Sequence, residues 1–140
     1  MVEVTKLKSG GIYEDKESYS RLVMVDNWIF MANTAGRNLT TRYMSEDAVE
    51  QAAQVFSNIE RSLEQVGATL ADVVRSHVHI QYREDAPAVM AYVGERFRGI
   101  DPASTVTCAP LGLPDFKVEI EVTAYKGAGA AKQNRISFKL

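Results

Sequence analysis

The strongest constraint on the fold is a strict two-residue alternation over residues 117–125. Its apolar side chains all fall on one side, and they are Val118, Ile120, Val122 and Ala124. The other side of the segment carries mostly charged and polar residues. This period is typical of a β-strand in a sheet with one buried face and one polar face. The rest of the chain must therefore supply an apolar layer for one face of that sheet.

Two helical patterns can supply this layer. The first helix is predicted to begin with Ser45 as its N-cap and to end at Gly67. Its apolar stripe recurs every 3.6 residues at Val49, Ala52, Ala53, Phe56, Ile59, Leu63 and Val66. The second helix is predicted to begin near Asp85, with Pro87 in its first turn. Its apolar stripe consists of Val89, Met90, Val93 and Phe97.

The remaining regular segments are strands. An Asp26-Asn27 pair is typical of a two-residue hairpin turn and separates the first two strands. These strands and two later ones are predicted at residues 21–25, 28–33, 73–82 and 104–109. The resulting order, β-β-α-β-α-β-β, predicts an α+β fold arranged as a two-layer sandwich.

Two helices with one apolar stripe each cover only one face of such a sheet. The uncovered face is predicted to carry Arg75, His77, His79, Gln81, Glu119 and Glu121. This set is too polar for a second core, and the edge strands also need partners. We therefore expect the chain to form a homo-oligomer.

Composition and charge narrow the class of protein. The chain has 140 residues, with 46% hydrophobic and 24% charged residues, which is typical of a globular domain. We expect one domain at residues 1–126, followed by a Gly/Ala linker and tail at 127–140. The net charge of −2 makes a nucleic-acid partner unlikely. Without an apolar leader or a membrane-length apolar stretch, the sequence predicts a soluble cytoplasmic protein with no membrane partner.

The order of these segments resembles the Rid (reactive intermediate deaminase, or YjgF-like) family. The motifs that carry the resemblance are Tyr19-Ser20-Arg21, DNWIFMANTAG, EQAAQVFSNIERSLEQVGATLADVV, DPAST and LPDFKVEIEVTA. The resemblance implies the chorismate-mutase-like fold of this family and a homotrimeric barrel with ligand clefts between subunits. It also implies hydrolysis of small enamine or imine metabolites by water attack, with no metal or organic cofactor.

The resemblance assigns site residues one at a time. Tyr19 matches the tyrosine of the family's cleft, and Glu119 matches the glutamate that orients the attacking water. Ala32 and Asn33 stand where the family usually has Ser-Gly, so this loop departs from the pattern. Val106 stands near the position of a family cysteine.

One departure bears directly on activity. Ser104 occupies the place of the arginine that binds the substrate carboxylate in the family. A serine cannot neutralise a carboxylate, and a charge-assisted pair is about twice as strong as a neutral hydrogen bond. Arg21, Arg37 or Arg42 would have to supply the charge instead, and Arg37 lies in a polar loop that resembles an anion-binding loop.

Three functions remain open at this point. The first is a Rid-type deaminase in which Glu119 is catalytic and Tyr19, Asn33 and Ser104 hold the substrate. The second is a non-catalytic small-molecule binder or regulator on the same scaffold, which the missing arginine favours. The third is an endoribonuclease activity, because relatives carry that label, but the chain has no basic stripe with stacking aromatics.

The other reactive side chains have simpler interpretations. His77 and His79 share one strand face, but two ligands do not make a metal site, so we expect structural histidines at a subunit interface. Cys108 has no base near it in sequence and is predicted to be a small buried side chain. Glu121 is expected to be a polar residue on the sheet face.

Overall fold

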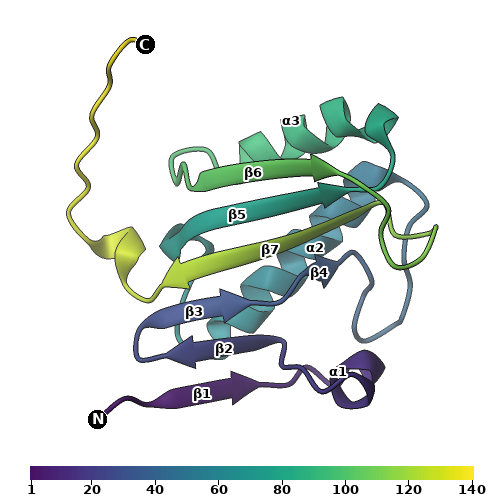
Figure 1. Ribbon diagram of the computed structural model, residues 1–140, viewed down its shortest axis with the longest axis horizontal. Helices are drawn as coiled ribbons and strands as arrows, with labels where there is room; N and C mark the ends of the chain where they lie inside the picture. Colours follow the sequence, from purple (N-terminus) through teal and green to yellow (C-terminus); the bar gives the residue numbers. More distant parts are fainter.

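Seven strands form one sheet in the computed structural model, which describes residues 1–140. The strands are β1 (Val4–Leu7), β2 (Leu22–Val25), β3 (Trp28–Met31), β4 (Thr34–Ala35), β5 (Val73–Ile80), β6 (Ala103–Cys108) and β7 (Val118–Tyr125). The helices are α1 (Ile12–Lys16), α2 (Ala48–Glu64) and α3 (Ala86–Arg96), with short 3₁₀ turns η1 (Leu70–Asp72), η2 (Arg83–Asp85) and η3 (Ala128–Ala130). The sheet order is β1-β2-β3-β7-β5-β6, with β4 also paired to β7 (Figure 1).

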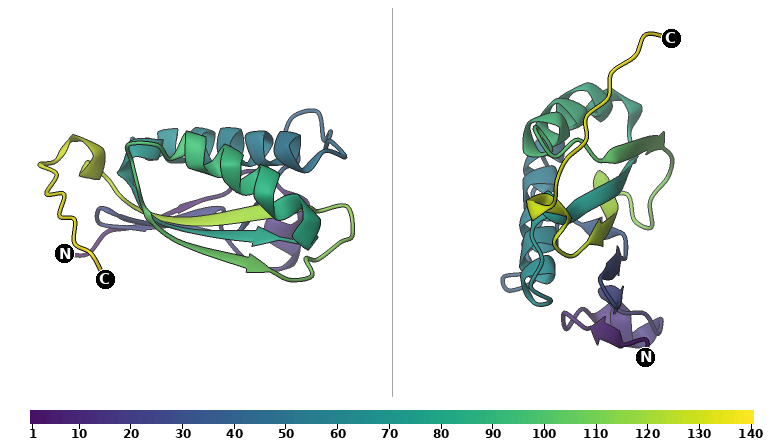
Figure 2. Two further views of the ribbon diagram at one scale, coloured as in Figure 1. Left: turned by 90° about the horizontal axis from the view of Figure 1, so that it is seen from above. Right: turned by 90° about the vertical axis from the view of Figure 1, so that its left-hand side faces the viewer.

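Helices α2 and α3 lie together on one face of this sheet, and the opposite face carries no helix (Figure 2). This arrangement confirms the predicted two-layer α+β sandwich. The core between the layers contains Phe56 of α2, Val89 of α3 and Ile120 of β7, all fully buried. Leu22 and Ile29 extend the same core under the first hairpin.

Strand β7 runs through the middle of the sheet and has the predicted alternation. Val118, Ile120, Val122 and Ala124 are all buried, and the residues between them are half-buried. The turn at Asp26-Asn27 connects β2 to β3 as predicted, with Asp26 at a φ of 50°.

Helix α2 begins later than the sequence predicted. Its N-cap is Asp47, whose Oδ2 accepts the N–H of Glu50 at 2.8 Å. The hydroxyl of Ser45 accepts the N–H of Asp47 at 3.0 Å and also contacts the Glu50 carboxylate. The prediction of Ser45 as the N-cap is therefore wrong by two residues, because the serine supports the capping aspartate.

The N-terminal segment contributes structure that the sequence patterns did not predict. Strand β1 pairs antiparallel with β2 and forms one edge of the sheet. Helix α1 has five residues and buries Glu14, which is 2% exposed. Its carboxylate accepts the backbone N–H of Ser9 at 2.8 Å and the hydroxyl of the same residue.

The glycine-rich segment after β7 is held against the domain, where its composition had predicted a flexible linker. The N–H of Gly129 donates to Asp72 Oδ1 at 2.8 Å. A Cβ at Gly129 would lie 2.6 Å from the side chain of Ala71, so the close approach of η3 to η1 requires a glycine. Residues 131–140 have no regular structure, and Arg135 contacts Asp101 at 2.6 Å. No helix combines the length and apolar character that crossing a membrane requires.

Candidate active site

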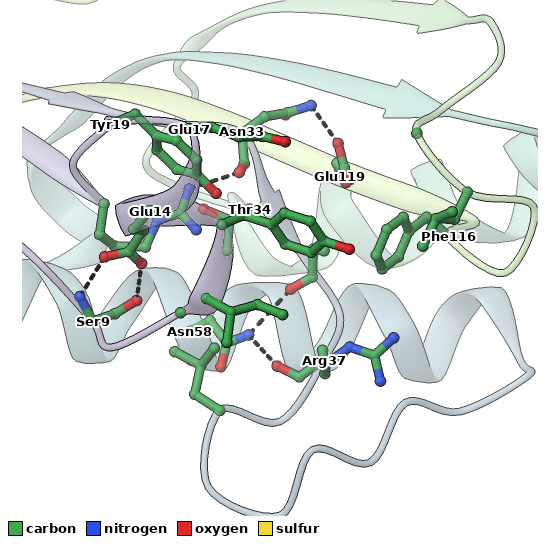
Figure 3. A pocket seen from close by; sticks show the side chains of 18 of the residues that line it. Ser9, Glu14, Glu17, Tyr19, Asn33, Thr34, Arg37, Asn58, Phe116 and Glu119 are labelled. Atoms are coloured by element: carbon green, nitrogen blue, oxygen red, sulfur yellow. Dashed lines mark hydrogen bonds between the residues drawn. The ribbon is translucent and has the colours of Figure 1, made fainter.

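A cavity of about 440 Å³ lies beside the end of the sheet, between the α1 segment, β4 with the loop that follows it, and the loop before β7 (Figure 3). This volume suits a small metabolite. Its apolar wall includes Ile12, Leu39, Leu113 and Phe116. The charged lining residues are Glu14, Glu17, Glu119, Arg21, Arg37 and Arg42.

Glu119 is the carboxylate on the sheet side of the cavity. It is half-buried on β7, opposite Ala35 of β4 and His79 of β5. The side-chain amide of Asn33 donates to its Oε2 at 2.7 Å (Figure 3). Burial raises the pKa of Glu119, while His79, Arg21 and the Asn33 hydrogen bond partly oppose this effect. The result is a fixed carboxylate whose affinity for a proton is increased, as a general base requires.

Arg21 lies deeper in the same cavity. Its side chain is almost completely buried, with the residue only 7% exposed. One guanidinium nitrogen, Nη2, donates to the backbone oxygen of Asn33 at 2.7 Å. The buried Nε has no hydrogen-bond partner. Burial lowers the pKa of Arg21, but the charges of Glu14 and Glu119 counteract this effect, and an arginine remains a cation at neutral pH.

Local structure places Tyr19 and Arg21 next to each other in the cavity. Tyr19 and Arg21 are two residues apart at the entry to β2, so their side chains lie on the same side of an extended segment. The guanidinium of Arg21 is 6.0 Å from the centre of the Tyr19 ring. Burial raises the pKa of Tyr19, so its hydroxyl stays protonated and can donate a hydrogen bond.

Asn58 holds the loop after β4 in place. This residue of α2 is 2% exposed, and its amide donates to the backbone oxygens of Ala35 at 3.1 Å and Arg37 at 2.8 Å (Figure 3). Gly36 lies between these two contacts, and a Cβ there would meet the Gln51 backbone oxygen at 2.5 Å. The loop therefore packs tightly on α2 and directs Arg37 to the cavity, where its guanidinium is 5.8 Å from the ring centre of Phe116.

The family model described as endoribonuclease L-PSP matches residues 13–126 of this chain. The chain belongs to this family. The match confirms the Rid/YjgF-like membership predicted from the motifs, and the matched range includes the cavity residues Tyr19, Asn33, Arg37 and Glu119.

Relatives within the family support the same assignment. A protein named 2-iminobutanoate/2-iminopropanoate deaminase from Dermatophagoides farinae is 34% identical over 105 residues, which cover 74% of this chain and 81% of the relative. The crystal structure of Rv2704 from Mycobacterium tuberculosis, described as a YjgF/YER057c/UK114 family member, is 31% identical, with a TM-score of 0.80 over 88% of this chain and 99% of that one. The YjgF gene product from E. coli is 25% identical, with a TM-score of 0.71 over 76% and 87% of the two chains.

The structure brings together four of the seven predicted site residues of this family member. Tyr19, Asn33, Arg37 and Glu119 line the cavity. Ala32 lines a separate shallow hollow together with Tyr19. Ser104 and Val106 lie on the edge strand β6, outside the cavity of the same chain.

Ser104 has a contact of its own on β6. Its register partner on β5 is Ser76, and their two hydroxyl oxygens are 3.3 Å apart. Val106 pairs with Val78 on the same strands. Ser104 and Val106 lie on the same face of the sheet as their β5 partners, the face that the helices cover. The β5 partners are buried there, whereas Ser104 and Val106 remain exposed at the sheet edge.

Most of the cavity residues were not among the predicted site residues, and three of these are important for its structure or charge. Arg21 was considered only as a possible source of charge, although the Tyr19-Ser20-Arg21 spacing already places it beside the tyrosine. Glu14 belongs to α1, a helix too short to give a periodic pattern. Asn58 interrupts the polar and apolar pattern of α2, and a buried polar residue of this kind is a signal that the sequence does contain.

Proposed function

We infer that this chain is a cofactor-independent hydrolase of the deaminase type, acting on a small enamine, imine or related carbonyl metabolite. The observation that carries this proposal is the pair formed by Glu119 and Asn33 at 2.7 Å on the wall of a metabolite-sized cavity. The name of the mite relative, 2-iminobutanoate/2-iminopropanoate deaminase, supports the same reaction class.

The proposed reaction adds water to a carbon–nitrogen double bond. Glu119 accepts a proton from the attacking water, whose oxygen bonds to the imine carbon as the carbon–nitrogen π bond breaks, and Glu119 then passes this proton to the nitrogen. The resulting carbinolamine then collapses: the carbon–nitrogen bond breaks, ammonia leaves and a carbonyl group remains. Asn33 fixes the orientation of the carboxylate, and the Tyr19 hydroxyl is a donor for the substrate.

Arg21 is the group that we assign to the anionic end of the substrate. A buried cation whose Nε has no hydrogen-bond partner is poorly compensated within the chain, so an anion bound nearby in the cavity would stabilise its charge. Arg37 and Arg42 add positive charge to the same lining. This assignment replaces the arginine that the family usually has at the position of Ser104.

The homotrimer is part of the same proposal. Trp28 and Phe30 are 46% and 49% exposed on the sheet face that carries no helix, as expected for a surface that a second copy covers. Ser104 and Val106 are exposed at the β6 edge, outside the cavity of their own chain, and in the proposed trimer they would face a neighbouring subunit. A cleft between subunits would therefore combine residues that one chain keeps apart.

Ammonia release from a freshly generated 2-imino acid tests the reaction. The native chain should accelerate it, and Glu119→Gln should lower kcat by about 100-fold or more, since a positioned general base contributes about that much. Glu64→Gln, at the exposed end of α2, is the matched control and should behave as the native chain. Full activity in Glu119→Gln would remove Glu119 from the mechanism.

The role of Arg21 needs a comparison within one variant. Arg21→Gln should raise KM for the carboxylate substrate by about 10- to 100-fold, because a charged hydrogen bond contributes about 1.5–3 kcal/mol. The same variant should change KM little for the corresponding imino amide, which has no negative charge. Equal losses for both substrates would indicate damaged folding and would contradict the assignment.

A non-catalytic binder is the second candidate, favoured by the neutral Ser104. It predicts no acceleration for any imino acid, together with a ligand-dependent rise in melting temperature. Both proposals allow the rise in melting temperature, so the rate of ammonia release is the measurement that distinguishes them.

A further inference from the structure

The uncovered face of the sheet carries a cluster that the proposed reaction does not use. His77 and His79 are neighbours on the same side of β5, with ring centres 3.9 Å apart and planes inclined by 23°. Glu121 of β7 is the register partner of His77. Its Oε1 lies 3.3 Å from His77 Nδ1 and 3.2 Å from His79 Nε2.

The arrangement around His77 resembles the environment of a metal ligand. Its Nε2 is 2.8 Å from the hydroxyl of Thr107, on β6. When Nε2–H donates to this hydroxyl, the lone pair of Nδ1 faces the Glu121 carboxylate, an arrangement that a bound cation stabilises. Metal-ligating histidines generally use their second nitrogen in such an outer hydrogen bond, which fixes the tautomer and the ring.

The separations within the cluster suit a transition-metal ion. Two ligand atoms at about 2.1 Å from a tetrahedral ion are about 3.4 Å apart. The two oxygen–nitrogen distances, 3.3 Å and 3.2 Å, are close to this value, and all three ligand atoms lie within 4.8 Å of one another. Because the two rings are stacked, coordination of one ion requires the imidazoles to turn until both nitrogen lone pairs point at it.

We propose that His77, His79 and Glu121 bind one divalent transition-metal ion of the zinc class per chain. Two imidazoles and one carboxylate form a ligand set that suits zinc and its neighbours and leaves coordination positions open. In the single chain these three side chains are 20%, 23% and 42% exposed, so an ion can reach them before subunits assemble. Cys108 is exposed at the edge of the sheet, so the prediction of a buried cysteine is wrong; it is not a ligand, because it lies on the opposite face, with its register partner Ile80.

Binding of Zn²⁺ and Co²⁺ to the full-length, tag-free chain tests this site. Calorimetry should give one ion per chain, and Co²⁺ should develop the visible absorption of a low-coordinate site. The chain has only 2 histidines, so His77→Gln and His79→Gln each remove half of its imidazoles. Each of these variants and Glu121→Gln should weaken binding by at least about 10-fold, and Thr107→Val by about 10-fold through loss of the outer hydrogen bond.

Two controls separate this site from others. Cys108→Ser and Glu64→Gln should bind the metal as the native chain does, and circular dichroism should show that every variant is folded. Native binding in His79→Gln, or loss of binding in Cys108→Ser, would overturn the proposal. So would a chain that binds neither ion.

Discussion

The two faces of strand β7 differ in both burial and charge. Val118, Ile120 and Val122 are buried under the helices, whereas Glu119 and Glu121 lie on the other side of the same backbone. Successive side chains of a strand alternate between faces, so one-residue steps separate the core from the chemistry. The chain can therefore keep charged groups in fixed positions without placing them in its core.

The largest expected effect is on the free energy of unfolding, and it differs between the two faces of β7. Ile120→Ala should lower the free energy of unfolding by about 2–5 kcal/mol, because it removes buried methyl groups and leaves a cavity. Glu121→Ala, one residue away, should change it by no more than about 0.5 kcal/mol. Urea denaturation of both variants measures the difference. Similar losses would show that the uncovered face also contributes a core.

The next effect concerns assembly through the uncovered face. Replacing Trp28 and Phe30 with serine should shift the proposed trimer towards smaller species, since both side chains are about half exposed in the single chain. Tyr43→Ser, at a side chain that is 67% exposed in a loop, should leave the assembly intact. Light scattering at several concentrations reports the result. A trimer that survives the double substitution would place the subunit contact elsewhere.

A buried polar group on the helix side gives an intermediate effect. Asn58→Ala should lower the free energy of unfolding by about 1–3 kcal/mol, because the backbone oxygens of Ala35 and Arg37 lose their buried donor. The loop that carries Arg37 should also become more mobile, and KM should rise because Arg37 is then less well positioned. Ser57→Ala, at the exposed neighbouring position of α2, is the control and should be close to neutral. Thermal unfolding and steady-state kinetics together measure both consequences.

The smallest effect is the pH dependence contributed by Glu119. Its pKa is raised in the folded chain by burial, so its stabilising contribution is full below the ordinary glutamate pKa and is lost as pH rises through the raised value. Glu119→Gln cannot ionise and should gain stability relative to the native chain over that rise. The gain in melting temperature should be at most about 3 °C. A gain that falls as pH increases would contradict the raised pKa.

Much of the fold could be predicted from periodicity. The alternation at residues 117–125 and the stripes of the two long helices were sufficient for the layers, because such patterns report burial directly. Strand β1 and helix α1 were not predicted, since four and five residues are too short for a clear period. Ser45 was a plausible cap, but the aspartate two residues later occupies the capping position.

The candidate site was predicted only in part, because contacts between segments distant in sequence decide it. The resemblance to the family identified Tyr19, Asn33 and Glu119, which line one cavity. It could not show that Arg21 is buried with an unpartnered Nε, because burial depends on segments distant in sequence. His77 and His79 were correctly placed on one face, but their contact with Glu121 depends on the register between two strands.

The amino-acid sequence alone determined the layers of this protein, because hydrophobic periodicity is local and each period permits only one kind of element. Tertiary structure decided which charged groups meet. Asn33 and Glu119 are 86 positions apart in the chain, and His79 and Glu121 are 42 apart, yet both pairs are in contact. Contacts between such distant residues are set by strand register and loop packing, which no local pattern specifies.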